Sequence, residues 1–205
     1  MSMTPDEWAW EEAMDRLSEE LYPAHKEQAI DEFTNDRLQS FYLTHREILQ
    51  PGIARIRQAG ELAKSHPSAS YVFSTTAIEL FLKAALLKPV VYGLVHNHTL
   101  AEVVVEETLG YSGFERYKKL LSKLFEELAR IDIARITRAG STIPLLTEAE
   151  KIQNVRNGII HRGEDVTEQQ ARHAEEVASA VLDVVLKMLA ALGLKVDNNG
   201  GIEVR

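Results

Sequence analysis

Residues 68–87, SASYVFSTTAIELFLKAALL, form the most apolar helix expected in this 205-residue chain and decide its fold class. Small and apolar side chains recur there at three- and four-residue steps, at Ser74, Ala77, Ile78, Phe81, Leu82 and Ala85. That spacing is typical of one face of an α-helix. Because Pro67 and Pro89 bracket the stretch and proline interrupts helices, we expect one helix here, at the centre of a helical bundle.

Capping boxes mark further helix starts on both sides of this stretch. In a capping box, a Ser or Thr at the N-cap is followed three residues later by Glu or Gln. Five pairs fit: Thr4 with Glu7, Thr99 with Glu102, Ser112 with Glu115, Thr147 with Glu150, and Thr167 with Gln170. They predict helices over about residues 5–21, 100–109, 113–138, 148–161 and 168–192. Another helix is expected over residues 28–65, interrupted near Pro51-Gly52, and Gly193 is expected to end the last helix.

These segments predict an all-α fold, an antiparallel helical bundle with an additional N-terminal helix. We expect residues 1–28 to form an N-terminal helical extension, residues 29–193 the bundle, and residues 194–205 a C-terminal tail. Within the tail, residues 202–204 could add a short strand.

The N-terminal helix is expected to be amphipathic, because Trp8, Trp10, Met14 and Leu21 lie along it. We expect this helix to pack on the bundle. Covering a partner or closing a dimer are the alternatives.

Composition excludes several classes of protein. A hydrophobic content of 45% over 205 residues suffices for one core, and no apolar run approaches the roughly 20 residues that span a bilayer. The first ten residues, MSMTPDEWAW, lack the basic start of a secretory signal, so a cytoplasmic location without membrane association is expected. The chain has no cysteine and no Walker or Rossmann signature, and no cofactor or metal is expected.

The net charge of −8 argues against a protein that coats nucleic acid, because phosphate neutralisation dominates that kind of affinity. A local basic site stays possible, since residues 116–138 carry seven Lys or Arg against three Asp or Glu. The alternative for that segment is a solvated helix face of mixed charge.

The candidate functional side chains are concentrated in residues 151–163, KIQNVRNGIIHRG. On a helix, Ile152, Val155 and Ile159 form an apolar stripe, and a second face carries Asn154, Asn157 and His161. Arg156 and His161 are about 140° apart around a regular helix. They can share a site only if the helix is distorted, for example at Gly158, or if a second copy completes the site.

Arg156-Asn157-Gly158-Ile159-Ile160-His161 resembles the ribonuclease motif of the HEPN family, an Arg followed by a polar residue and then, four to six residues after the Arg, by a His. Residues 75–83, TTAIELFLK, resemble the family's helix that bears an acidic residue, and residues 98–103, HTLAEV, resemble the opening that often follows it. The resemblance covers roughly residues 30–192.

The resemblance implies a homodimer in which two Arg–His motifs face each other and RNA is cut by its own 2′-hydroxyl, without a metal. His161 would move the proton, Arg156 would stabilise charge on the phosphate, and Asn157 would orient the scissile group or the His. Glu79 would hold Arg156 or His161; its alternative is an ordinary pair with Lys83. A toxin or defence effector, silenced by an antitoxin or other protein partner, is the role that the resemblance suggests.

Two alternatives stay open for the motif. An Arg-Asn…His at a helix end can simply cap carbonyls, and many HEPN-like proteins bind nucleotide, RNA or protein without cleaving anything.

His96-Asn97-His98 is shared with some metal nucleases, but its surroundings here are expected to be helical. His25, His45 and His66 show no metal-binding spacing.

Overall fold

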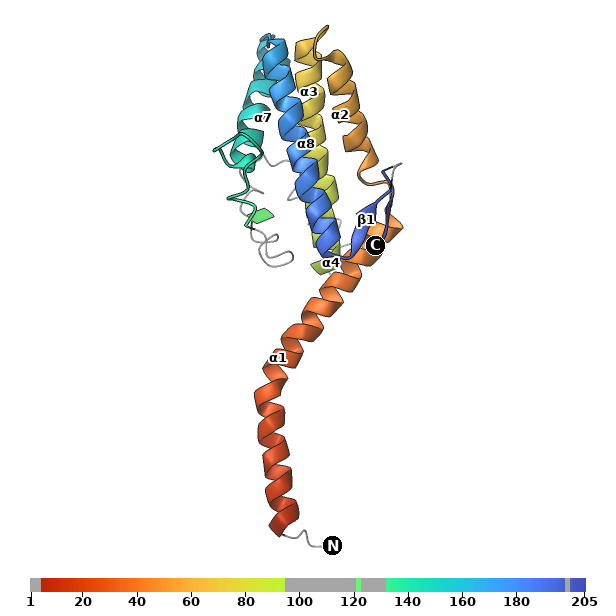
Figure 1. Ribbon diagram of the computed structural model, residues 1–205, viewed down its shortest axis with the longest axis vertical. Helices are drawn as coiled ribbons and strands as arrows, with labels where there is room; N and C mark the ends of the chain where they lie inside the picture. The colour runs from red at the N-terminus through yellow and green to blue at the C-terminus, as the bar shows by residue number, and fades with distance from the viewer. Residues whose placement is uncertain (1–4, 95–120, 123–131, 198–199) are drawn as a thin grey trace. The chain divides into compact units, whose positions relative to one another are not determined.

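The computed structural model (Figure 1) describes residues 5–94, 121–122, 132–197 and 200–205. The chain divides into two compact units, Met1–Arg37 and Leu38–Arg205. The described elements are helices α1 (Pro5–Thr44), α2 (Gln50–Leu62), α3 (Pro67–Glu79), η1 (Leu80–Leu87), α4 (Lys88–Leu94), α7 (Leu145–Arg162) and α8 (Glu168–Ala191), and strands β1 (Leu194–Val196) and β2 (Ile202–Val204). The all-α prediction is confirmed for this part of the chain. The predicted helix over residues 100–109 and most of 113–138 lie outside it.

Helix α3 is central, as its sequence predicts. It packs against α2, α7 and α8, which run side by side with it (Figure 1). Ala77 and Ile78 are buried, and Ser70 donates from its hydroxyl to the carbonyl of Ala59 in α2 at 2.8 Å. The helix continues into η1, a π-helix that contains the buried Phe81. Together α3 and η1 cover the predicted 68–87 helix.

Residues Pro67–Leu87 are also long and apolar enough, by length and composition, to cross a bilayer. However, 65% of an 18-residue window in this stretch is buried inside the protein, and core helices of soluble proteins pass the same test.

The N-terminal half of the chain has fewer breaks than predicted. One helix, α1, runs from Pro5 to Thr44 where two separate helices were expected, so the predicted break between residues 21 and 28 is wrong. Good helix formers on both sides of Pro23 carry the helix through it. The break expected near Pro51-Gly52 falls at residues 45–49, because Pro51 occupies the first turn of α2. Backbone N–H groups in the first turn have no partner within the helix, so a proline there costs no helical hydrogen bond.

The predicted helix over residues 113–138 is wrong at its described end, because residues 132–138 are not helical. Asp132 folds back on its own backbone and accepts a hydrogen bond from the N–H of Ala134 at 3.1 Å, a local alternative to helix. Thr137 then pairs with Pro144 in an isolated β-bridge. Pro144 is the N-cap of α7, so the predicted capping box at Thr147 is also wrong.

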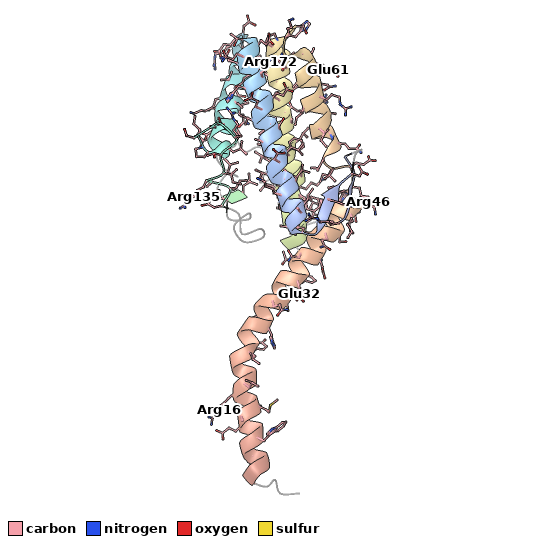
Figure 2. The ribbon with its side chains drawn as sticks, viewed as in Figure 1. Arg16, Glu32, Arg46, Glu61, Arg135 and Arg172 are labelled. Carbon is pink, nitrogen blue, oxygen red and sulfur yellow. The ribbon has the colours of Figure 1, made fainter. Side chains whose placement is uncertain are left out.

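The capping box at Thr167 is confirmed: its hydroxyl accepts from the N–H of Gln170, and the Gln170 amide accepts from the N–H of Thr167. Helix α8 is followed by Gly193, whose φ of 70° few other residues tolerate. Strands β1 and β2 then form an antiparallel hairpin. Its Ile202 is buried in the core and donates its N–H to the carbonyl of Arg46, which Figure 2 labels beside the hairpin.

Candidate functional site

Three of the four predicted site residues lie on α7. This helix packs on α3 and α8 with a buried face that includes Leu145, Ala149 and Ile152. It is α-helical through Gly158 and ends at Gly163, a left-handed residue whose N–H donates to the carbonyl of Gly158. Since the helix is not distorted, Arg156 and His161 point about 140° apart. One copy of α7 therefore does not bring the two side chains to one face.

Arg156 is half-buried on the side of α7 nearer the core. Its Nη1 donates to Oδ1 of the neighbouring Asn157 at 3.1 Å. Its Nε is buried without a hydrogen-bond partner, and no carboxylate pairs with it in the described ranges. Because a guanidinium offers five N–H donors and no acceptor, Arg156 keeps unused donors and an uncompensated positive charge.

His161 lies on the opposite, solvent-facing side of α7. Its side chain is exposed, as is Asn154 two turns earlier, and Asn157 stands between them on the same face. Among the residues that the structure describes, no polar group contacts the His161 ring. Asn157 thus forms a hydrogen bond with Arg156 and none with His161 among the described residues. The amide was expected to orient the scissile group or the His, whereas here it holds Arg156.

Glu79 reaches the motif through another residue. At the end of α3, its Oε1 accepts a hydrogen bond from Nε2 of Gln153 on α7 at 3.1 Å. Gln153 precedes Arg156 by three residues and so lies on the same side of α7. Among the described residues, Glu79 makes its hydrogen bond to Gln153 and none to Arg156 or His161. Gln153 is a supporting residue that sequence reasoning missed, because only the packing of α7 on α3 joins it to Glu79.

From the sequence, Gly158 is expected only as a point at which α7 could be distorted. A Cβ there would lie 2.8 Å from Cδ of Glu164 and 2.8 Å from Nη2 of Arg162, so the glycine makes room for this pair. Nε of Arg162 donates to Glu164 at 2.6 Å. The hydrogen bond and then the charge of Glu164 raise the pKa of Arg162. The pair closes the turn that follows His161.

A second polar cluster, centred on Arg138, lies between the 132–144 segment and helices α7 and α8. The guanidinium donates to the carboxylate of Glu148, which is only 4% exposed, at 3.2 Å, and to Glu176 at 3.2 Å. Its Nη2 lies 3.0 Å from Nδ1 of His173, and since arginine only donates, that nitrogen is the acceptor. Ser141 completes the cluster by donating to Glu148 at 3.0 Å.

The basic face expected over residues 116–138 is mostly outside the described ranges. Its two described arginines are both paired: Arg135 lies 3.0 Å from Asp132, and Arg138 belongs to the cluster above. These two charges are balanced within the chain.

Comparisons of the chain with protein-family models, with curated proteins and with solved structures found no match. In the described ranges, no three His, Asp or Glu side chains gather closely enough to hold a metal ion. A guanidinium without a carboxylate partner can bind a phosphate or carboxylate, and an exposed imidazole is accessible to a ligand from solvent.

Proposed function

We propose that this chain is a metal-independent endoribonuclease of the HEPN type, which acts as a homodimer in the cytoplasm as a toxin or defence effector. The observation that carries the proposal is the state of the two motif residues on α7. Arg156 is held by Asn157 and lacks a carboxylate partner in the described ranges, while His161 is open to solvent. If the Arg and the His had only a structural role, we would expect the guanidinium to form an ion pair and the ring nitrogens to form hydrogen bonds within the fold.

The divergence of Arg156 and His161 supports a site shared by two copies. The two side chains are about 140° apart on a regular helix, so they cannot meet at one site on the same α7. Each Arg156 therefore needs a His161 from a second copy of the chain. Ile160, next to His161, has 51% of its surface exposed, which suits a residue buried by a second α7. A two-fold axis near Ile160 would bring Arg156 of one copy towards His161 of the other, because an isologous interface pairs the same patch twice.

The proposed reaction uses the substrate's own nucleophile. The 2′-hydroxyl oxygen attacks the adjacent phosphorus and gives up its proton, the bond from phosphorus to the 5′-oxygen breaks, and that oxygen takes up a proton. The products are a 2′,3′-cyclic phosphate and a 5′-hydroxyl. His161 would transfer the proton, Arg156 would bind the phosphate oxygens as negative charge grows, and Asn157 would hold the guanidinium in place.

The experiment is cleavage of total cellular RNA by purified protein in excess EDTA. Wild type is compared with Arg156→Ala and His161→Ala, with Arg172→Ala and His66→Ala as matched controls, because both control side chains are exposed and lie outside the motif. We expect cleavage by wild type and both controls, with loss of at least about a hundredfold in each motif variant. Circular dichroism and sedimentation must show the same fold and oligomer in all five proteins.

Mixing the two inactive variants tests whether the site is shared. Random pairing makes half of the dimers mixed, each with one intact site, so up to about a quarter of wild-type activity should return. Recovery would support a site built from two copies. No recovery, with both single variants inactive, would place Arg156 and His161 in one copy and contradict the dimeric arrangement.

A non-catalytic binding module is the second candidate, and one observation favours it. His161 has no neighbour in the described chain to orient its ring, whereas general bases are commonly held by a third group. Well-folded wild type that leaves RNA intact in EDTA, yet binds RNA or nucleotide in an Arg156-dependent manner, would support this candidate over the ribonuclease.

A further inference from the structure

Helix α1 carries an exposed apolar stripe that the proposed function does not use. Trp10, Met14, Leu17 and Leu21 follow one another at steps of four, three and four residues, which aligns them along one side of a helix. Their exposed fractions are 69%, 46%, 48% and 43%. At 1.5 Å per residue the stripe is about 17 Å long, enough for three turns of a second helix.

The stripe lies within an unusually acidic part of the chain. Residues 1–37, which make up the first compact unit, contain eleven Asp or Glu against three Lys or Arg, a net charge of −8. That equals the net charge of the whole protein, so residues 38–205 are balanced, with twenty residues of each sign. The charge of the protein is concentrated on the unit that carries the stripe.

Acidic residues border the stripe in sequence, and its basic neighbour is neutralised. Glu11 directly follows Trp10, and Glu20 directly precedes Leu21, so each occupies a helix position beside the stripe. Arg16 pairs with Glu12 one turn away, at 2.5 Å, and Figure 2 labels it on α1. The helix positions on both sides of the stripe are therefore acidic in the sequence.

This charge selects among the possible occupants. RNA and an anionic membrane surface are both repelled by a segment of charge −8. A second copy would bring two segments of that charge together, which like-charge repulsion opposes. A basic amphipathic helix matches both features, since its apolar face fits the stripe and its Lys and Arg face the flanking acids.

We propose that the stripe formed by Trp10, Met14, Leu17 and Leu21 is a docking surface for a basic amphipathic helix of a protein partner. The stripe shares no residue with the motif on α7, so docking does not depend on RNA cleavage.

The chain contains two tryptophans, Trp8 and Trp10, and both lie on this helix, so intrinsic fluorescence reports on the surface without a label. The probe is a synthetic helical peptide of about five turns with Leu on one face and Lys on the other. A peptide with Glu in place of Lys is the comparison. We expect a blue shift of tryptophan emission with the Leu/Lys peptide, weakened by salt, and none with the Leu/Glu peptide.

A matched pair of variants localises the effect. Leu17→Lys places a positive charge in the stripe, whereas Tyr22→Lys makes the same change at a residue that is 65% exposed and about 140° further around α1. We expect Leu17→Lys to raise the Kd of the Leu/Lys peptide at least tenfold and Tyr22→Lys to leave it within about twofold. Circular dichroism must show equal helix content in both.

Five results would overturn the proposal. Equal loss in the two variants, or an equal response to the Leu/Glu peptide, would make binding non-specific. A blue shift on phosphatidylglycerol vesicles, without one on the peptide, would assign the stripe to membranes. A dimer abolished by Leu17→Lys would assign it to a second copy. Emission that is already blue-shifted in the free protein and unmoved by the peptide would mean that the chain itself covers the stripe.

Discussion

Glu79 at the end of α3 accepts a hydrogen bond from Gln153 of α7 at 3.1 Å, and this contact joins the central helix to the turn that precedes Arg156. The two residues are 74 positions apart in sequence, so the contact exists only because α3 and α7 pack together.

Loss of this contact should weaken the fold modestly. Glu79→Ala leaves the half-buried Gln153 amide without its acceptor, and we expect the free energy of unfolding to fall by about 1 kcal/mol, measured by urea denaturation. Glu79→Gln keeps an oxygen acceptor and should retain most of the stability. Glu61→Ala, at an exposed position labelled in Figure 2, is the control. Equal effects of Glu79→Ala and Glu61→Ala would show that the contact is energetically silent.

The proposed dimer makes Ile160 a sensitive position. Ile160→Lys would place a charge in the interface next to His161, so we expect the dimer to dissociate in sedimentation velocity and RNA cleavage to fall with it. Ile143→Lys, at a residue that is 36% exposed outside the motif, is the control. A variant that stays dimeric and active after Ile160→Lys would exclude an interface at this end of α7.

Gly52 is required for the approach of α2 to η1. A Cβ at this position would lie 2.6 Å from Cζ of the buried Phe81 ring, so Gly52→Ala should cost about 1–3 kcal/mol of stability. At Gly60 in the same helix, a Cβ meets only the flexible end of Glu175. Gly60→Ala should therefore be neutral or stabilising, since alanine favours helix by about 1 kcal/mol. Thermal unfolding of the two variants measures this difference, and the reverse order would contradict the packing described here.

Arg138 forms an ion pair with the buried carboxylate of Glu148. Arg138→Met leaves the Glu148 carboxylate, which is 4% exposed, with the Ser141 hydroxyl as its one remaining side-chain partner in the described part of the chain, and we expect a loss of about 3 kcal/mol in the free energy of unfolding. Arg172→Met, which breaks the exposed pair with Glu168, should cost at most about 1 kcal/mol. The double variant Arg138→Met with Glu148→Gln should recover part of the loss, and a failure to recover would show that Arg138 acts mainly through other contacts.

Buried tyrosines should make the protein sensitive to alkaline pH. Burial raises the pKa of Tyr42 well above its usual range and raises the pKa of Tyr71 to about 12. The neutral hydroxyl is the form that the fold favours, so its stabilisation is complete below the unfolded pKa of about 10 and is lost as pH rises towards the folded value.

Urea denaturation between about pH 9 and 12 should therefore show falling stability. Tyr42→Phe should flatten that slope, although it also loses the hydrogen bond from the hydroxyl to the carbonyl of Ala85 at every pH. Tyr22→Phe, at a residue that is 65% exposed, should leave the slope unchanged. A slope identical in all three proteins would mean that other groups control alkaline unfolding.

Much of the fold is predictable from local signals. The apolar period of residues 68–87 predicts the central helix, and the Thr167–Gln170 box with Gly193 predicts both ends of α8. These features depend on residues within a turn or two of each other. The same reasoning fails at residues 132–138, where a hydrogen bond to Asp132 and the bridge between Thr137 and Pro144 compete with the helix.

The candidate site divides in the same way. The sequence by itself determines that Arg156 and His161 sit on one helix about 140° apart, because the helical period depends only on their spacing. Only the tertiary structure decides that Arg156 has no carboxylate partner among the described residues, that Glu79 reaches α7 through Gln153, and that Arg138 is committed to Glu148. Those contacts join residues far apart in the chain, and helix packing, which no local pattern encodes, brings them together.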